Sequence, residues 1–98
     1  MREDCQKATA EGLDNIRRAI DAIDEDIIRL LRQRAGLALE AGRLKKSSGR
    51  SILDPDRENL IIGRLAALAE EPLSGAAVTD IYQAIIKACR KLQNNSKP

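Results

Sequence analysis

Histidine is absent from this 98-residue chain, and the sequence has no tryptophan or phenylalanine and only one tyrosine. Without histidine, catalysis by an imidazole acid or base, histidine ligation of a metal and the Ser-His-Asp arrangement are excluded together. The two cysteines, Cys5 and Cys89, lie far apart in the sequence, so neither a disulfide framework nor a zinc site is predicted.

Long apolar runs are also missing. The first twelve residues contain no apolar core of a signal peptide, and no later run is long enough to span a bilayer. The net charge is only +2, and the basic residues are mixed with acidic ones rather than gathered in blocks. These features predict a cytoplasmic protein that binds neither nucleic acid nor an anionic membrane.

What the sequence does contain is typical of one helical domain, with 33% charged and 43% hydrophobic residues. Because Tyr82 is the single aromatic residue, the core must be built from Leu, Ile and Ala. Such a core buries little apolar surface per residue, which favours association with a second copy.

The longest pattern is a proline-free helix predicted over residues 13–46, with Asp14 as a plausible N-cap. Residues 1–12 are polar and unpatterned, and we predict that they form a disordered tail. Apolar residues return every three or four positions along the helix, which indicates a face meant for burial. This seam consists of Leu13, Ile16, Ile20, Ile23, Ile27, Leu30, Arg34, Leu37, Ala41 and Leu44.

The predicted helix is too long for a compact monomer. At about 1.5 Å per residue it would extend roughly 50 Å, whereas a domain of this size has a radius of gyration of about 13 Å. The remaining residues cannot cover the whole seam, so the sequence predicts a homodimer in which a second copy does.

One seam position is an arginine, Arg34. A guanidinium keeps its charge, and leaving it buried and unpaired would cost several kcal/mol, about the penalty for breaking an internal ion pair. We therefore expect an anion opposite Arg34.

Two further helices follow a break at Ser47-Ser48-Gly49. Asp54 as N-cap and Pro55 as the first helical residue start the second helix, which we expect to end at Glu71-Pro72. The third is predicted from Ala76 to Leu92 or Gln93, its apolar residues including Ile81 toward the core and Lys87, Arg90 and Lys91 outward. The predicted fold is all-α, with a three-helix domain over residues 13–93 and a disordered tail over residues 94–98.

Several polar residues do not fit a purely structural pattern. Arg34 and Lys45 share a helix face about 16 Å apart along the axis, so their long side chains can converge on a small dianion. Arg17 lies about 25 Å from Arg34 and about 100° around the helix, so one small ligand cannot touch both in one chain. In an antiparallel pair, however, the partner's Arg17 can reach this chain's site.

Each of these residues also has a plain interpretation. Arg17 alone is more often a solvated charge, Lys45 and Glu58 suit the dipoles of their helix ends, and Asp54 is explained by capping. Cys89 and Gln93 alone suggest a small core residue and a frayed terminal amide. Within the first helix, Gly36 and Gly42 are either merely tolerated or mark the close approach of another helix or a ligand.

In order and spacing, the chain from Leu13 to Gln93 resembles the all-helical chorismate mutases. The resemblance rests on I-R-x-x-I-D-x-I-D at Ile16 to Asp24, L-x-x-R at Leu31 to Arg34, E-x-G-R-x-K at Glu40 to Lys45, D-P-D-R-E at Asp54 to Glu58, and Tyr82-Gln83 with Ile85-Ile86. It implies an interlaced homodimer that performs the Claisen rearrangement of chorismate to prephenate without a cofactor or a metal.

The resemblance also implies a role for each matching residue. Arg34 and the partner's Arg17 would hold the two carboxylates, with Arg57 supporting that charge network. Lys45 and Gln93 would donate to the ether oxygen from opposite sides. Glu58, together with the backbone near Asp54, would bind the ring hydroxyl. Cys89 would lie near the ring carboxylate, at a position where related enzymes often have serine.

Three alternatives stay open at this stage. An isochorismate-pyruvate lyase, or a mutase acting on an amino analogue of chorismate, would use the same helical scaffold. A helical dimer acting only as a binding or scaffolding module is a third possibility, but it leaves Arg34 unexplained. The sequence is also compatible with docking to another enzyme of aromatic biosynthesis.

Overall fold

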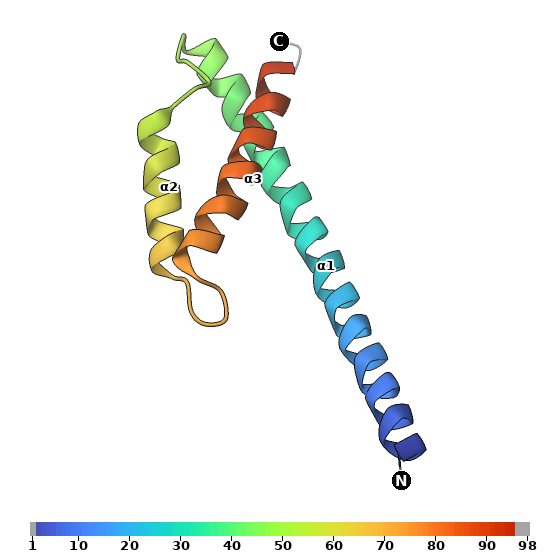
Figure 1. Cartoon of the computed structure of the whole chain (residues 1–98). Helices are drawn as coiled ribbons and strands as arrows, with labels where there is room; N and C mark the ends of the chain where they lie inside the picture. The colour runs from blue at the N-terminus through green and yellow to red at the C-terminus, as the bar shows by residue number, and fades with distance from the viewer. Residues whose placement is uncertain (1, 96–98) are drawn as a thin grey trace. The chain divides into compact units, whose positions relative to one another are not determined.

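The computed structural model describes the backbone of residues 2–95 and the side chains of residues 9–95. It contains three α-helices, α1 (Arg2–Ser47), α2 (Pro55–Ala67) and α3 (Gly75–Asn95), shown in Figure 1. The predicted all-α fold class is confirmed. Within the described residues, no helix is both long enough and apolar enough to cross a membrane. The chain divides after Arg34 into two units.

The start of α1 differs from the prediction. The helix begins at Arg2, so residues 2–12 are helical rather than a tail, and Asp14 lies inside the helix instead of capping it. The segment contains no proline and a single glycine, and most of its residues have good helix propensity. The favourable propensity of this segment therefore outweighs its lack of apolar pattern. Met1, the other residue of the predicted tail, lies outside the described residues.

The first unit comprises the α1 residues up to Arg34. Its seam residues Leu13, Ile16, Ile20, Ile23, Ile27 and Leu30 are between 46% and 59% exposed. A row of apolar side chains this long rarely stays in contact with water in a stable protein. The exposure is what the predicted dimer requires of a single chain, and the dimer itself remains a prediction.

The second unit begins with the remainder of α1 and its predicted end. The helix stops at Ser47, and Gly49 adopts a φ of 73°, a left-handed conformation that glycine reaches without steric cost. The next helix also starts where predicted, because Asp54 Oδ1 accepts a hydrogen bond from the Arg57 backbone N–H at 3.1 Å and Pro55 occupies the first turn. Both signals are local, and both are confirmed.

The other ends of α2 and α3 differ from the prediction. α2 ends at Ala67, four residues before Glu71, because the Leu68 N–H bonds to the Leu65 carbonyl and tightens the last turn. α3 begins at Gly75, with the Ser74 hydroxyl accepting from the Ala77 N–H at 3.1 Å. It runs to Asn95, past the predicted end, and residues 96–98 lie outside the described part of the chain.

The core of the second unit lies along α3, which packs beside α2 (Figure 1). Val78, Ile86 and Gln93 are buried, whereas Ile81, which we expected in the core, is 48% exposed. The buried positions recur at intervals of seven or eight residues. The buried face of α3 is therefore narrower than the apolar pattern of its sequence predicts. A polar amide, Gln93, occupies one end of this face.

The crossing of α1 and α3 depends on Gly42. A Cβ placed on Gly42 would lie 3.0 Å from Gln93 Cγ and 3.2 Å from Gln93 Cβ, whereas one placed on Gly36 would meet nothing within 4 Å. Of the two interpretations of these glycines, the close approach of a second helix is correct for Gly42. Among the residues of this chain that the structure describes, no such approach occurs at Gly36.

We expect Gly42→Ala to destabilise the protein by about 1 to 3 kcal/mol, the usual cost of overpacking. The added methyl group must displace a Gln93 side chain that is buried and held by a hydrogen bond to the Ala38 carbonyl. Gly36→Ala is the matched control and should stabilise α1 by up to about 1 kcal/mol. Urea unfolding of both variants at one protein concentration tests this. Equal stability of the two would show that the helices tolerate a side chain at the crossing.

Candidate functional site

The predicted site residues are divided between the two units. Arg17 and Arg34 belong to the first unit, where Arg17 is exposed and Arg34 is half-buried. The other six belong to the second unit and come from all three helices or their ends: Lys45, Asp54, Arg57, Glu58, Cys89 and Gln93. The anion expected opposite Arg34 therefore stays a prediction.

Gln93 is fixed to α1 by two hydrogen bonds. Its Nε2 donates to the Ala38 carbonyl at 2.6 Å, and its backbone carbonyl accepts from Lys46 Nζ at 3.1 Å. Because the last carbonyls of α3 have no partner within the helix, the Lys46 contact also caps that end. Gln93 is only 9% exposed, so its interpretation as a frayed terminal amide is wrong.

Lys45 precedes this anchor by one residue, in the last turn of α1. Its backbone carbonyl accepts from the Arg50 N–H at 2.7 Å and from the Ser48 hydroxyl at 3.2 Å, so the turn is fixed at that residue. The side chain is half-buried. Lys45 therefore lies on α1 next to Lys46, the residue that binds the Gln93 backbone carbonyl. Convergence of the Lys45 ammonium group with the Gln93 amide stays a prediction.

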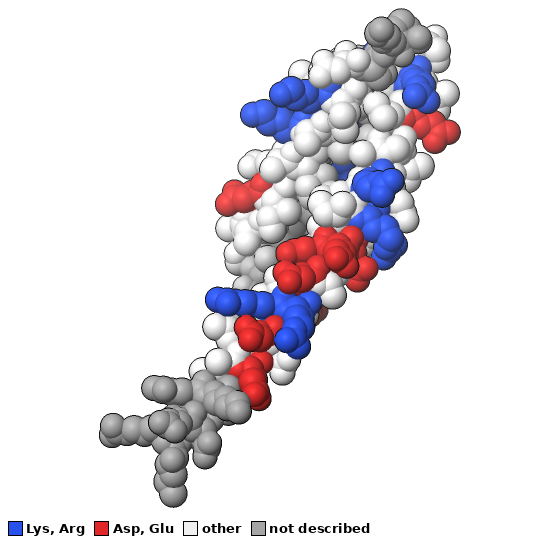
Figure 2. All heavy atoms as spheres, turned by 90° about the vertical axis from the view of Figure 1, so that its right-hand side faces the viewer, with Lys and Arg blue, Asp and Glu red and all other residues white. Residues whose placement is uncertain are grey.

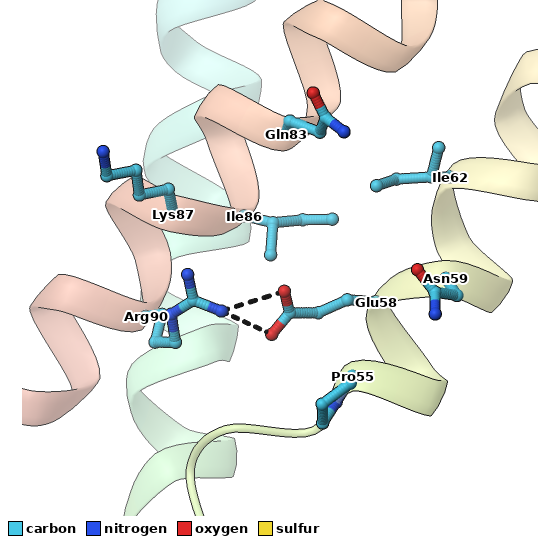
Figure 3. A pocket seen from close by; sticks show the side chains of 8 residues that line it. All are labelled: Pro55, Glu58, Asn59, Ile62, Gln83, Ile86, Lys87 and Arg90. Atoms are coloured by element: carbon cyan, nitrogen blue, oxygen red, sulfur yellow. Dashed lines mark hydrogen bonds and ion pairs between the residues drawn. The ribbon is translucent and has the colours of Figure 1, made fainter.

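Glu58 is fixed to α3 by an ion pair that we did not predict. Arg90 NH1 donates to both carboxylate oxygens, at 2.9 and 2.8 Å, as Figure 3 shows. We expected Arg90 to point outward, but its side chain is only 31% exposed and that of Glu58 only 23%. No sequence signal separates Arg90 from Lys87 or Lys91, because the pairing depends on how the faces of α2 and α3 meet.

The last turns of α3 therefore link the other two helices. Gln93 bonds to α1, Arg90 bonds to Glu58 of α2, and the half-buried Cys89 lies one turn before Gln93. At the start of α2, Asp54 is half-buried and occupied as the N-cap, and Arg57 is exposed. Through these contacts, Lys46 of α1 and Glu58 of α2 are both bound to the last turns of α3.

An open pocket of about 310 Å³ lies between α2 and α3. Glu58, Arg90, Ile62 and Ile86 line it together with Asn59, Gln83, Lys87 and Pro55, as Figure 3 shows. Of the predicted site residues, only Glu58 reaches this pocket. The pocket therefore contains one of the predicted site residues and not the whole set.

The described surface carries charges of both signs. On the face in Figure 2, Lys and Arg side chains alternate with Asp and Glu, and no continuous basic stripe forms there. Among the residues that the structure describes, no three Asp, Glu or Cys side chains gather closely enough to hold a metal ion. The lysine, arginine and amide groups among the predicted site residues are of the kind that binds a small polyanion.

Known proteins resemble this chain in sequence and in fold. The model of the family described as chorismate mutase type II matches residues 16–94. The chain is 38% identical over 91 residues to a bifunctional chorismate mutase/prephenate dehydratase from Aquifex aeolicus, a match that covers 89% of this chain and 25% of the relative. It is 34% identical over 84 residues to the chorismate mutase of Methanocaldococcus jannaschii, covering 85% of each.

A solved structure agrees with these matches. The chorismate mutase of Helicobacter pylori, crystallised in complex with prephenate, superposes with a TM-score of 0.78 at 35% identity, covering 85% of this chain and 90% of that one. The present chain thus spans a quarter of the length of the bifunctional relative but most of the length of the other two proteins.

Proposed function

The chain belongs to the type II chorismate mutase family, and we propose that it rearranges chorismate to prephenate in a cage built from its three helices and the α1 helix of a second copy. The observation that carries the proposal is the buried Gln93, whose side-chain amide donates to the Ala38 carbonyl and whose backbone carbonyl accepts from Lys46, the neighbour of Lys45 on α1. A neutral donor and a cation placed in this way suit the binding of an ether oxygen that gains negative charge.

The reaction needs little from the protein besides shape and charge. In a Claisen rearrangement, one carbon–oxygen bond of the ether breaks while one carbon–carbon bond forms, and no proton is transferred in that step. The enzyme must hold the substrate in its compact reactive conformer and stabilise the charge that develops on the ether oxygen. This requirement explains how a chain without histidine can be a catalyst.

Within this proposal, Lys45 and Gln93 donate to the ether oxygen. The amide of Gln93 carries two hydrogens, and one of them is already used by the Ala38 carbonyl. That bond orients the amide, so the second hydrogen can be aimed at the substrate. Lys45 also contacts a carboxylate of the substrate.

The remaining roles concern the other substituents. Arg34 and the partner's Arg17 bind the two carboxylates, and Arg57 supports that charge network. Glu58 accepts from the ring hydroxyl, beside the backbone near Asp54. Cys89 lies near the ring carboxylate, where a thiol is a weaker donor than the serine hydroxyl common in related enzymes.

We also propose that the folded enzyme is a homodimer. All eight leucine and isoleucine residues of the α1 seam are between 46% and 67% exposed in the single chain. At about 1.5 to 3 kcal/mol for each fully buried side chain, a partner that covers this row provides a large driving force for association. The same contact would bring the partner's Arg17 to this chain's site.

The proposal also concerns where the reaction takes place and which other enzyme the protein binds. The chain spans a quarter of a bifunctional relative that also carries a prephenate dehydratase activity by name. An association with another enzyme of aromatic biosynthesis is therefore proposed, as is a cytoplasmic location for the reaction.

Incubation of the purified protein with chorismate tests the activity. The ultraviolet absorbance of chorismate should fall, and acid treatment of the product should yield phenylpyruvate, which forms from prephenate. Lys45→Ala protein purified in the same way controls for a contaminating host mutase. Release of pyruvate from isochorismate, or turnover of the amino analogue alone, would instead favour one of the two enzymatic alternatives. A scaffold protein would act on none of them.

The proposed chemistry predicts a nearly flat pH profile. Gln93 is a neutral amide in the position of the second ether donor, so kcat should change little between about pH 5 and pH 8. Initial rates at saturating chorismate in buffers of constant ionic strength give the profile. A steep loss of kcat across neutral pH would show that a titrating group takes part in the reaction.

A further inference from the structure

The Glu58–Arg90 pair changes the charge that the site presents to the ring substituent. Both carboxylate oxygens of Glu58 lie within 2.9 Å of Arg90 NH1, and the two side chains are less than one-third exposed. In such surroundings the interaction between two charges is stronger than in bulk water. The group opposite the substituent is therefore a neutralised pair rather than a bare carboxylate.

The pair leaves Glu58 able to accept another hydrogen bond. A carboxylate offers about four lone-pair directions, and a single nitrogen that bridges both oxygens uses only the inner ones. Both side chains line the open pocket between α2 and α3 (Figure 3), so the carboxylate can be reached from outside. Glu58 can thus accept from a neutral hydroxyl while it remains bound to Arg90.

The remaining charge in the pocket is positive. Glu58 is the single carboxylate among the eight described residues that line the pocket, and Arg90 and Lys87 are the cations. A cationic substituent would meet a carboxylate already paired with one cation, in a pocket that a second cation also lines. A neutral substituent meets no such repulsion. Because Arg90 compensates the charge of Glu58, the two carboxylates of the substrate are not repelled by a bare carboxylate in the pocket.

We propose that Arg90 is a positioning residue that selects a hydroxyl over an ammonium group on the substrate ring, by pairing with Glu58. The inference rests on the proposed function, because it concerns the hydroxyl partner of the same reaction. In this inference Arg90 acts through Glu58. The choice between chorismate and its amino analogue then depends on the ion pair between α2 and α3.

The test compares two constants in each variant: the KM for chorismate, and the inhibition constant of the amino analogue, which carries an ammonium group at neutral pH, as a competitor. For Arg90→Gln we expect the KM for chorismate to rise by about tenfold and the amino analogue to bind more tightly relative to chorismate by about tenfold, an effect of the size expected for one charge-assisted contact. Lys91→Gln removes an exposed cation of α3 that does not line the pocket, and its ratio of the two constants should stay within about twofold of wild type.

Two further variants separate charge from folding. Glu58→Gln leaves Arg90 uncompensated and should shift the ratio in the opposite direction, against the amino analogue. Arg90→Lys keeps the charge and should stay closer to wild type than Arg90→Gln. If Arg90→Gln does not fold, as judged by circular dichroism, Arg90→Met, which keeps a long side chain without the charge, takes its place in the comparison. A ratio that no variant changes would mean that the pair only joins α2 to α3.

The failure of this inference can be distinguished from failure of the proposed function. Wild-type protein that leaves chorismate unchanged overturns both. Wild-type protein that forms prephenate, with the same selectivity in Arg90→Gln and Glu58→Gln, overturns the role of Arg90 alone.

Discussion

Lys45→Ala is expected to lower kcat by about 10²-fold or more, because a donor to a developing oxyanion is typically worth about 3 to 4 kcal/mol. The backbone carbonyl of Lys45 accepts hydrogen bonds from Arg50 and Ser48, and those bonds do not depend on its side chain. Alanine also has the highest helix propensity, so the end of α1 should persist. Steady-state kinetics with chorismate give kcat and KM separately.

Lys91→Ala is the control for this substitution. Lys91 is an exposed lysine in α3, close in sequence to Gln93, and its removal should change kcat by less than about twofold. Turnover near the wild-type rate in Lys45→Ala would remove Lys45 from the mechanism. An equal loss in both variants would point to a general effect of net charge on the binding of an anionic substrate.

The helix boundaries that the sequence predicts well are those that depend on nearby residues. Asp54 and Pro55 start α2, and Gly49 follows the end of α1, because capping and left-handed backbone are matters of a few consecutive residues. The end of α2 was misplaced because the prediction depended on Pro72, whereas the helix already tightens at Leu68. The start of α1 was misplaced because the absence of an apolar pattern does not end a helix.

The burial of two side chains of the second unit could not be predicted from the sequence. Gln93 looked like an exposed terminal amide, and its burial depends on the missing side chain of Gly42 on another helix. Arg90 was expected to face solvent, and its partner Glu58 is 32 positions away in sequence. Spacing along one helix predicts which face of the helix a residue occupies. It does not predict which residues of another helix pack against that face.

We propose that the site needs residues from two chains. The helix-length argument and the exposed α1 seam both favour a second copy of the chain, and the spacing of Arg17 and Arg34 favours a site shared between copies. These arguments are independent, because one concerns apolar surface and the other concerns the reach of two charged side chains. A direct test must therefore detect a residue that acts across the interface.

Subunit complementation provides that test. Arg17→Ala and Lys45→Ala homodimers should each be nearly inactive. A heterodimer of the two variants, co-expressed with different affinity tags and purified on both, should regain about half of the wild-type activity per dimer, since two-fold symmetry gives one intact site and one doubly defective site. Arg18→Ala, a neighbouring arginine in α1 that bonds to Asn15, controls for general effects on the helix and should remain active.

The outcome distinguishes the two possible sources of the arginine. If Arg17 acted within its own chain, each site of the heterodimer would carry one defect, and the activity would remain at the low level of the homodimers. The expected difference between the two cases is about 50-fold, given a loss of about 10²-fold in the Lys45→Ala site. Recovery to half of the wild-type activity thus requires both a dimer and a site built from two chains. A failure to isolate any heterodimer by tandem purification would reject the dimer, and the exposed α1 seam would then need another covering partner.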